Sequence, residues 1–228
     1  MLGIIIFYIL LISSFTLLGS FYVRRFNKPD MLIGLYVAFV VIAQILATKI
    51  SLFDFGFVKL IGPSGVLVFS LTYLFTDIVN EKFGLAETKK MILIGLISQI
   101  AMSCFLWIGI KMTPAPFWSV QDVWSGIFSL VPRITLASYI AFIISENVDA
   151  YIFDWFKKVT KGKNLWMRNV FSSLPSLLLD SFIFVPLAFW GLAPLGTMII
   201  GQTALKWLVG VISIPFMYLN KYVMGEGK

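Results

Sequence analysis

The chain has 228 residues, of which 59% are hydrophobic and only 13% are charged. A soluble domain of this length needs far more charge on its surface, so the composition excludes an ordinary soluble protein. There is no histidine and only one cysteine, Cys104, which excludes Ser-His-Asp and Cys-His catalysis, His-ligated metal sites and an internal disulfide. No GxxxxGK[ST] loop occurs, so no P-loop ATPase is encoded in this sequence.

Long apolar runs follow one another along the chain. A helix that spans a bilayer needs roughly 20 mostly apolar residues, and about seven stretches come close to this length. They lie at residues 2–22, 31–48, 63–80, 91–112, 132–156, 169–190 and 197–220. The pattern predicts an all-α, polytopic bundle of about seven transmembrane helices, forming a single domain over residues 1–228.

Two connecting segments differ from the simple loops between these runs. Residues 49–62 form a short segment of mixed character. The stretch 121–133 is too short to span and too polar at Gln121 and Asp122, so we interpret it as an interfacial or re-entrant piece.

The basic residues indicate how the helices are oriented. Thirteen of the eighteen lysines and arginines follow the first, third and fifth runs or lie in the C-terminal tail, whereas Lys49, Lys59 and Lys111 fall on the other side. Because cytoplasmic loops are enriched in Lys and Arg, we expect the N-terminus outside and the C-terminus in the cytoplasm. This pattern also accounts for the net charge of +7, so nucleic acid is not an expected partner.

Asp180 and Lys206 are the most informative residues, because each lies near the middle of an apolar run. A charge at the bilayer centre costs at least about 2.5–3.5 kcal/mol. On neighbouring antiparallel helices, their depths agree within about one turn, so a salt bridge is feasible. Such a pair either lines the path of a polar solute or fixes the helix register, and the sequence leaves both roles open.

Other polar residues lie at or near membrane depth. Asp77, Asn80 and Glu81 share one helix face, and Glu146 and Asp149 share another. The alternatives are solvated helix ends, snorkelling of a long side chain and close packing of small residues. The candidate substrate-binding residues are Asp77, Asn80, Glu81, Arg133, Ser138, Glu146, Asp149, Asn169, Ser173, Asp180, Gln202 and Lys206. No catalytic residue, metal ligand or cofactor is predicted.

This set of side chains suits a planar, polar solute. Aromatic residues make up 16% of the chain, and their faces stack on rings, while carboxylates accept paired hydrogen bonds from an N–H/NH₂ edge. Guanine-like bases have such an edge. An amino acid or a sugar would use many of the same groups, so the chemistry alone does not select among them.

Four motifs occur in order between residues 31 and 220: LTYLFTDIVNEKFG, PRITLASYIAFIISENVDAYIFDWFKK, LWMRNVFSSLPSLLLDSFIFVPLAFWG and ALKWLVGVISIPFMY. In these motifs the chain resembles the YhhQ-like queuosine precursor transporters. The resemblance implies uptake of 7-cyano-7-deazaguanine or its 7-aminomethyl relative across the cytoplasmic membrane of a prokaryote. It also implies a six-helix core over residues 31–220, preceded by an extra helix and basic loop at 1–30.

The resemblance assigns the motif positions to the transport site. Within the motifs, Leu177 and Glu146 stand where family members often have Gln. The positions that match the family pattern are Asp77, Asn80, Glu81, Arg133, Ser138, Asp149, Arg168, Asn169, Ser173, Asp180 and Lys206.

Two other functions stay open at this point. The chain would also suit a substrate-capture subunit of an ATP-driven vitamin-type uptake complex. An intramembrane enzyme would need Asp180 with Asp149, or Ser173 or Ser176 with Lys206. The expected partners are the lipid bilayer and a small nucleobase-like solute, and a homodimer and a separate ATPase complex are left open.

Overall fold

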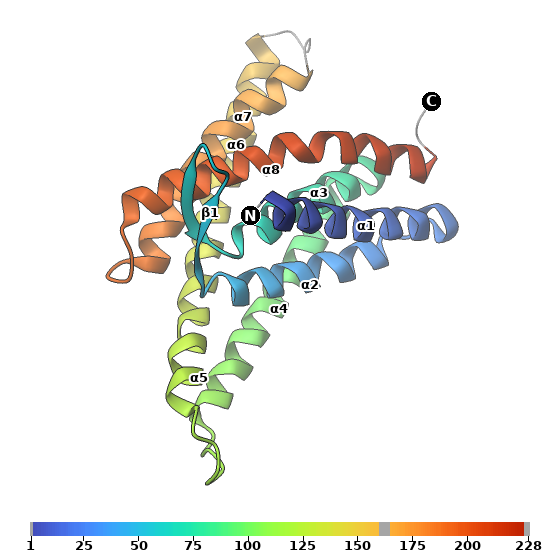
Figure 1. Cartoon of the computed structure of the whole chain (residues 1–228). Helices are drawn as coiled ribbons and strands as arrows, with labels where there is room; N and C mark the ends of the chain where they lie inside the picture. Colours follow the sequence, from blue (N-terminus) through green and yellow to red (C-terminus); the bar gives the residue numbers. More distant parts are fainter. Residues whose placement is uncertain (1, 160–164, 226–228) are drawn as a thin grey trace.

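A computed structural model of the chain describes residues 2–159 and 165–225. These residues form mostly α-helices, together with one short β-hairpin (Figure 1). The elements in chain order are α1 (Leu2–Phe26), α2 (Asp30–Leu46), β1 (Ile50–Asp54), β2 (Lys59–Pro63), α3 (Val66–Phe83), α4 (Leu85–Lys111), α5 (Gln121–Phe128), α6 (Leu130–Val159), α7 (Leu165–Phe189) and α8 (Leu195–Met224).

Each of the seven predicted apolar runs largely coincides with one of the long helices α1, α2, α3, α4, α6, α7 and α8. Glycines mark two of the boundaries, because Gly84 and Gly225 adopt positive φ angles of 84° and 86° just after α3 and α8. Positive φ angles are costly for residues other than glycine, and glycines with such angles commonly follow the last residue of a helix. The segment 121–133, expected at the membrane interface, holds the exposed helix α5 and the start of α6.

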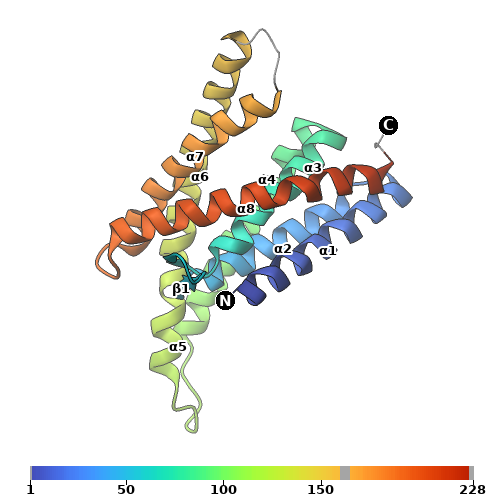
Figure 2. The same ribbon diagram turned by 45° about the horizontal axis from the view of Figure 1, so that its top comes forward.

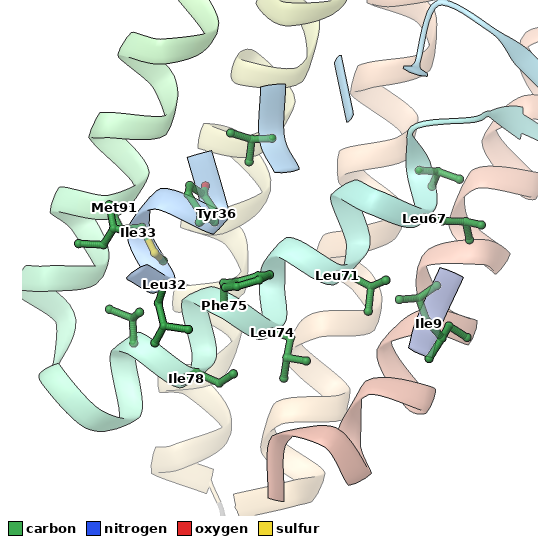
Figure 3. Packing of buried hydrophobic residues seen from close by; sticks show 14 of the residues in the cluster. Ile9, Leu32, Ile33, Tyr36, Leu67, Leu71, Leu74, Phe75, Ile78 and Met91 are labelled. Carbon is green, nitrogen blue, oxygen red and sulfur yellow. The ribbon is translucent and has the colours of Figure 1, made fainter. Parts of the chain in front are cut away.

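Helix α3 forms the centre of the main hydrophobic core. Ten of its eighteen residues are buried, and it packs against α2, α4 and α8. Figure 3 shows Leu71 and Phe75 of this helix among side chains from its neighbours, including Leu32. A second core cluster joins α6, α7 and the start of α8, where Ile134, Val185 and Met198 are fully buried.

Large apolar side chains also cover much of the outer surface. Phe105, Trp190 and Tyr218 are all about 70% exposed, which a soluble protein would avoid over so wide an area. The spans from Ile6 to Phe26, Leu85 to Lys111, Gln121 to Ser145 and Leu195 to Met224 are long and apolar enough to cross a membrane, and α2 and the second half of α7 are shorter apolar helices. The chain is therefore a helical membrane protein.

The segment 49–62 is more ordered than the expected mixed connection, because it contains most of the antiparallel hairpin β1–β2, with Ile50 paired to Pro63 and Asp54 to Lys59. At its tip, the backbone N–H of Gly56 donates to the Asp54 carboxylate at 2.8 Å. That bond, together with Lys59 nearby, lowers the pKa of Asp54. Strand β2 packs against α8 (Figure 2). The hairpin thus belongs to the body of the protein.

Candidate functional site

One cavity brings together residues from α2, α3, α6, α7 and α8, which are far apart in the sequence. We call it the ion-pair cavity. Its lining consists of Ala43, Gln44, Ala47, Pro63, Gly65, Val66, Phe69, Ser138, Asp180, Phe184, Gln202 and Lys206. Four of these residues, Ser138, Asp180, Gln202 and Lys206, are among the candidates selected from the sequence.

Two glycines allow the backbones around this cavity to approach each other closely. A Cβ atom on Gly65 would lie 2.1 Å from the carbonyl oxygen of Ala43, and one on Gly201 would lie 2.1 Å from that of Ile61. Any larger residue would have to push these segments apart. The contact at Gly65 brings the start of α3 close to the end of α2. The contact at Gly201 brings β2 close to α8 beside Gln202.

The charges in the cavity are a single buried pair. Lys206 Nζ donates a hydrogen bond to Asp180 Oδ2, and the two residues are only 2% and 3% exposed. The lysine nitrogen also lies 5.6 Å from the ring centroid of Phe69, within the range of a cation–π contact. Because the pair is internally neutral, it makes the cavity polar without giving it a net charge.

Gln202 adds an unused hydrogen-bond acceptor to this cavity. Its side chain is 2% exposed, and its Oε1 atom has no hydrogen-bond partner within the described structure. A buried amide oxygen without a partner costs free energy, about 1–3 kcal/mol, unless something donates to it. An N–H group of a bound solute, or a water molecule, would satisfy it.

The cavity is narrow in this conformation. Its empty space, including the part that opens outward, is about 340 Å³, and the part where the centre of a water molecule fits is about 30 Å³. The 30 Å³ is the volume to compare with pockets for small molecules, which usually measure about 300–1,000 Å³. The cavity can therefore hold water as it stands, while a bicyclic base requires its walls to move apart.

Several predicted residues lie elsewhere. Asp77, Asn80 and Glu81 are exposed near the end of α3, and Glu81 forms an ion pair with Lys221 at the end of α8. They line neither this cavity nor the neighbouring one described below. These three residues are close in space to each other but not to Asp180.

Arg133 contacts the backbone of α7 and the residue that follows it. It is exposed, and its Nε and Nη2 atoms donate to the carbonyl oxygens of Leu187 and Trp190 at 2.8 and 3.1 Å. These carbonyls lie at the C-terminal end of α7, where a cation is favourable because the helix dipole is negative there. The side chains of four further candidates, Glu146, Asp149, Asn169 and Ser173, lie outside the described residues.

Gln44 and Phe69 line the cavity but were not among the residues selected from the sequence. Gln44 is a buried amide within the second apolar run, so its polarity at that depth was a usable signal. Phe69 carried no such signal, because it is one of 22 phenylalanines in the chain.

Comparison with known proteins identifies the family. The family described as "Putative vitamin uptake transporter" matches residues 63–220, a range that holds all the candidate site residues. The chain belongs to this family. A probable queuosine precursor transporter of Bacillus subtilis (strain 168) is 28% identical over 214 residues, covering 92% of this chain and 91% of that protein. No solved structure matches the chain.

Membership of this family confirms the resemblance inferred from the four motifs. Family and relative are described as transporters, so the chain is a membrane transporter rather than an enzyme. The apolar helices and the family together agree with a small-molecule solute and a lipid bilayer as partners.

Proposed function

We propose that this chain imports a 7-deazaguanine base, a precursor of queuosine or archaeosine, and that the base binds in the ion-pair cavity. The observation that carries the proposal is the buried Asp180–Lys206 pair with the unused Gln202 oxygen in the same cavity. The name of the Bacillus subtilis relative supports the class of solute.

The cavity offers the groups that such a base requires. A deazaguanine presents a ring N–H and an exocyclic NH₂ on one edge, and both donate hydrogen bonds. A carboxylate has about four acceptor positions, so Asp180 can accept from this edge while it holds Lys206. Gln202 supplies one more acceptor, and the rings of Phe69 and Phe184 supply faces for stacking.

We extend the proposal to the other predicted contacts. We infer that Glu146, Asp149, Asn169 and Ser173 contribute to the same path from α6 and α7. For Asp77, Asn80, Glu81 and Arg133, contact with the solute stays a prediction, and it would occur outside the ion-pair cavity. We further propose seven membrane spans in the plasma membrane, with the N-terminus outside.

Uptake by the purified protein tests this function. We expect liposomes that contain only this chain to accumulate radiolabelled 7-cyano-7-deazaguanine, and we expect D180N and K206A to lower the initial rate at least tenfold. Glu87 offers a matched control, because it forms an exposed ion pair with Lys90 at 3.2 Å, outside the cavity. The variant Glu87→Gln should transport like the wild type.

Other results of the uptake experiment would contradict specific parts of this proposal. Wild-type uptake by both D180N and K206A would remove the ion pair from the mechanism. Binding of the base without uptake in liposomes would instead favour a capture subunit that requires a separate ATPase complex. If the wild type neither binds nor transports the base, the solute assignment is wrong.

A further inference from the structure

A second cavity lies next to the ion-pair cavity, between α2, α3, α4 and α6. Its lining consists of Tyr36, Val40, Phe69, Thr72, Tyr73, Thr76, Ile92, Leu96, Gln99, Ser138, Tyr139 and Phe142. We call it the tyrosine cavity. Its empty space, including the part that opens outward, is about 460 Å³, and the part where the centre of a water molecule fits is about 30 Å³, so this cavity too must widen to hold a bicyclic solute. The two cavities share Phe69 and Ser138, so they meet at these side chains.

The same helix faces line both cavities. On α3, Val66 and Phe69 line the first, and Phe69, Thr72 and Thr76 line the second, at the three- and four-residue spacings of one helical face. Val66 and Thr76 are separated by about 15 Å along the helix. The hydrocarbon core of a bilayer is about 30 Å thick. The two cavities together therefore extend over roughly half of the distance across it.

Two sets of contacts connect residues of the two cavities. Gln44, which lines the ion-pair cavity, donates from Nε2 to Oε1 of Gln99, which lines the tyrosine cavity, at 2.7 Å. The ring of Phe69 lies near both Lys206, whose Nζ atom is 5.6 Å from the ring centroid, and Tyr73, whose ring centroid is 5.7 Å away in an edge-on arrangement. Phe69 and the Gln44–Gln99 hydrogen bond therefore lie where the two cavities adjoin.

The two cavities differ in electrostatic character. Among the described residues, the lining of the tyrosine cavity contains no charged side chain, in contrast to the Asp180–Lys206 pair in the first. A charged solute would lose its counter-charge on entering, which costs several kcal/mol inside a protein. A neutral, planar solute avoids this cost and can stack on Tyr73, Tyr139 or Phe142.

We propose that the tyrosine cavity is a second binding site for a neutral, planar heteroaromatic solute, which enters it from the ion-pair cavity past Phe69 and the Gln44–Gln99 hydrogen bond. This inference rests on the proposed function. It adds that the solute leaves the ion pair behind during transport, so that Asp180 and Lys206 serve the first step only.

Filling the tyrosine cavity tests the inference without touching the ion-pair cavity. Leu96 lines the tyrosine cavity, whereas its neighbour Ile97 is 58% exposed on the outer face of α4. We expect L96W to bind radiolabelled 7-cyano-7-deazaguanine in detergent within about threefold of the wild-type affinity, but to lower uptake into liposomes at least tenfold. I97W should bind and transport like the wild type. Thr76→Leu fills the same cavity from α3 and should behave like L96W.

The outcomes separate this inference from the function on which it rests. Failure of the wild type to bind the base would count against the proposed function. With a wild type that binds and transports, normal uptake by both L96W and Thr76→Leu overturns the second site. Loss of binding together with uptake, in variants that keep the wild-type unfolding temperature, also overturns it, because the ion-pair cavity would then not hold the solute independently.

Discussion

Asp180 and Lys206 neutralise each other inside the protein, so removal of either one leaves the other buried and unpaired. We expect Asp180→Leu and Lys206→Leu each to lower the free energy of unfolding by about 3–5 kcal/mol, and the double variant to recover most of this loss. All three should fail to transport. Thermal unfolding in detergent and uptake in liposomes measure the two effects. A double variant with normal uptake would show that the pair only fixes helix register.

Gln202 differs from the ion pair because its Oε1 atom has no hydrogen-bond partner among the described residues, so its removal breaks no bond to that atom. We expect Gln202→Leu to leave the unfolding temperature unchanged or slightly higher, while it weakens binding of the base about tenfold, equivalent to about 1.4 kcal/mol. Thr203 is the matched control, since its buried hydroxyl also has no partner in the part of the chain that the structure describes but does not line the cavity. Thr203→Val should bind normally, and equal binding by both variants would contradict the role of Gln202.

Sequence reasoning selected Asp180, Lys206 and Gln202 because polar groups deep in an apolar run are costly. It could not separate them from Asp77, which lies within an apolar run, or from Glu81, which comes directly after that run. The difference depends on where α3 ends relative to the bundle and on which way each helix face is turned. Both are set by packing between helices, which a pattern along one chain does not contain.

At the scale of elements, the helices followed from their apolar length, but the β-hairpin did not. Its strands have only five residues each, which is too short for a clear alternating pattern. Its position depends on a tertiary contact, because β2 reaches α8 only where Gly201 leaves room beside Ile61. Sequence alone shows a glycine there, without showing what approaches it.

This contact gives a prediction about α8. The variant Gly201→Ala should displace β2, because its new methyl group would lie 2.1 Å from the Ile61 carbonyl oxygen, and we expect lower stability and at least tenfold lower uptake. Gly210 lies on the same helix, and a methyl group added there would have nothing within 4 Å. Gly210→Ala should be neutral or stabilising by up to about 1 kcal/mol. Equal behaviour of the two variants in thermal unfolding and uptake would exclude a tight β2–α8 contact.

At the scale of the whole molecule, several of the chain's connections lie at opposite ends, while the α4–α5 connection projects away from both (Figures 1 and 2). The α3–α4 junction and the end of α8 lie at one end in both views, whereas the β-hairpin and the α7–α8 connection lie at the other (Figures 1 and 2). This arrangement is the one that the basic residues favour, with Lys82, Lys89 and Lys221 at the first end. The positive-inside rule predicts that this end faces the cytoplasm.

Cysteine labelling in intact cells tests this orientation. The cysteine at position 104 is exposed, so it is first replaced by serine, and single cysteines are then introduced as Phe57→Cys, Phe117→Cys or Lys89→Cys. Phe57 and Phe117 are 90% and 88% exposed and should react with a membrane-impermeant maleimide from outside. Lys89→Cys should react only after the membrane is permeabilised. Labelling of all three positions from outside would mean that α4 does not cross the membrane. Labelling of position 89 alone from outside would mean that the protein has the opposite orientation. The ion-pair cavity would then lie nearer the cytoplasm than the tyrosine cavity.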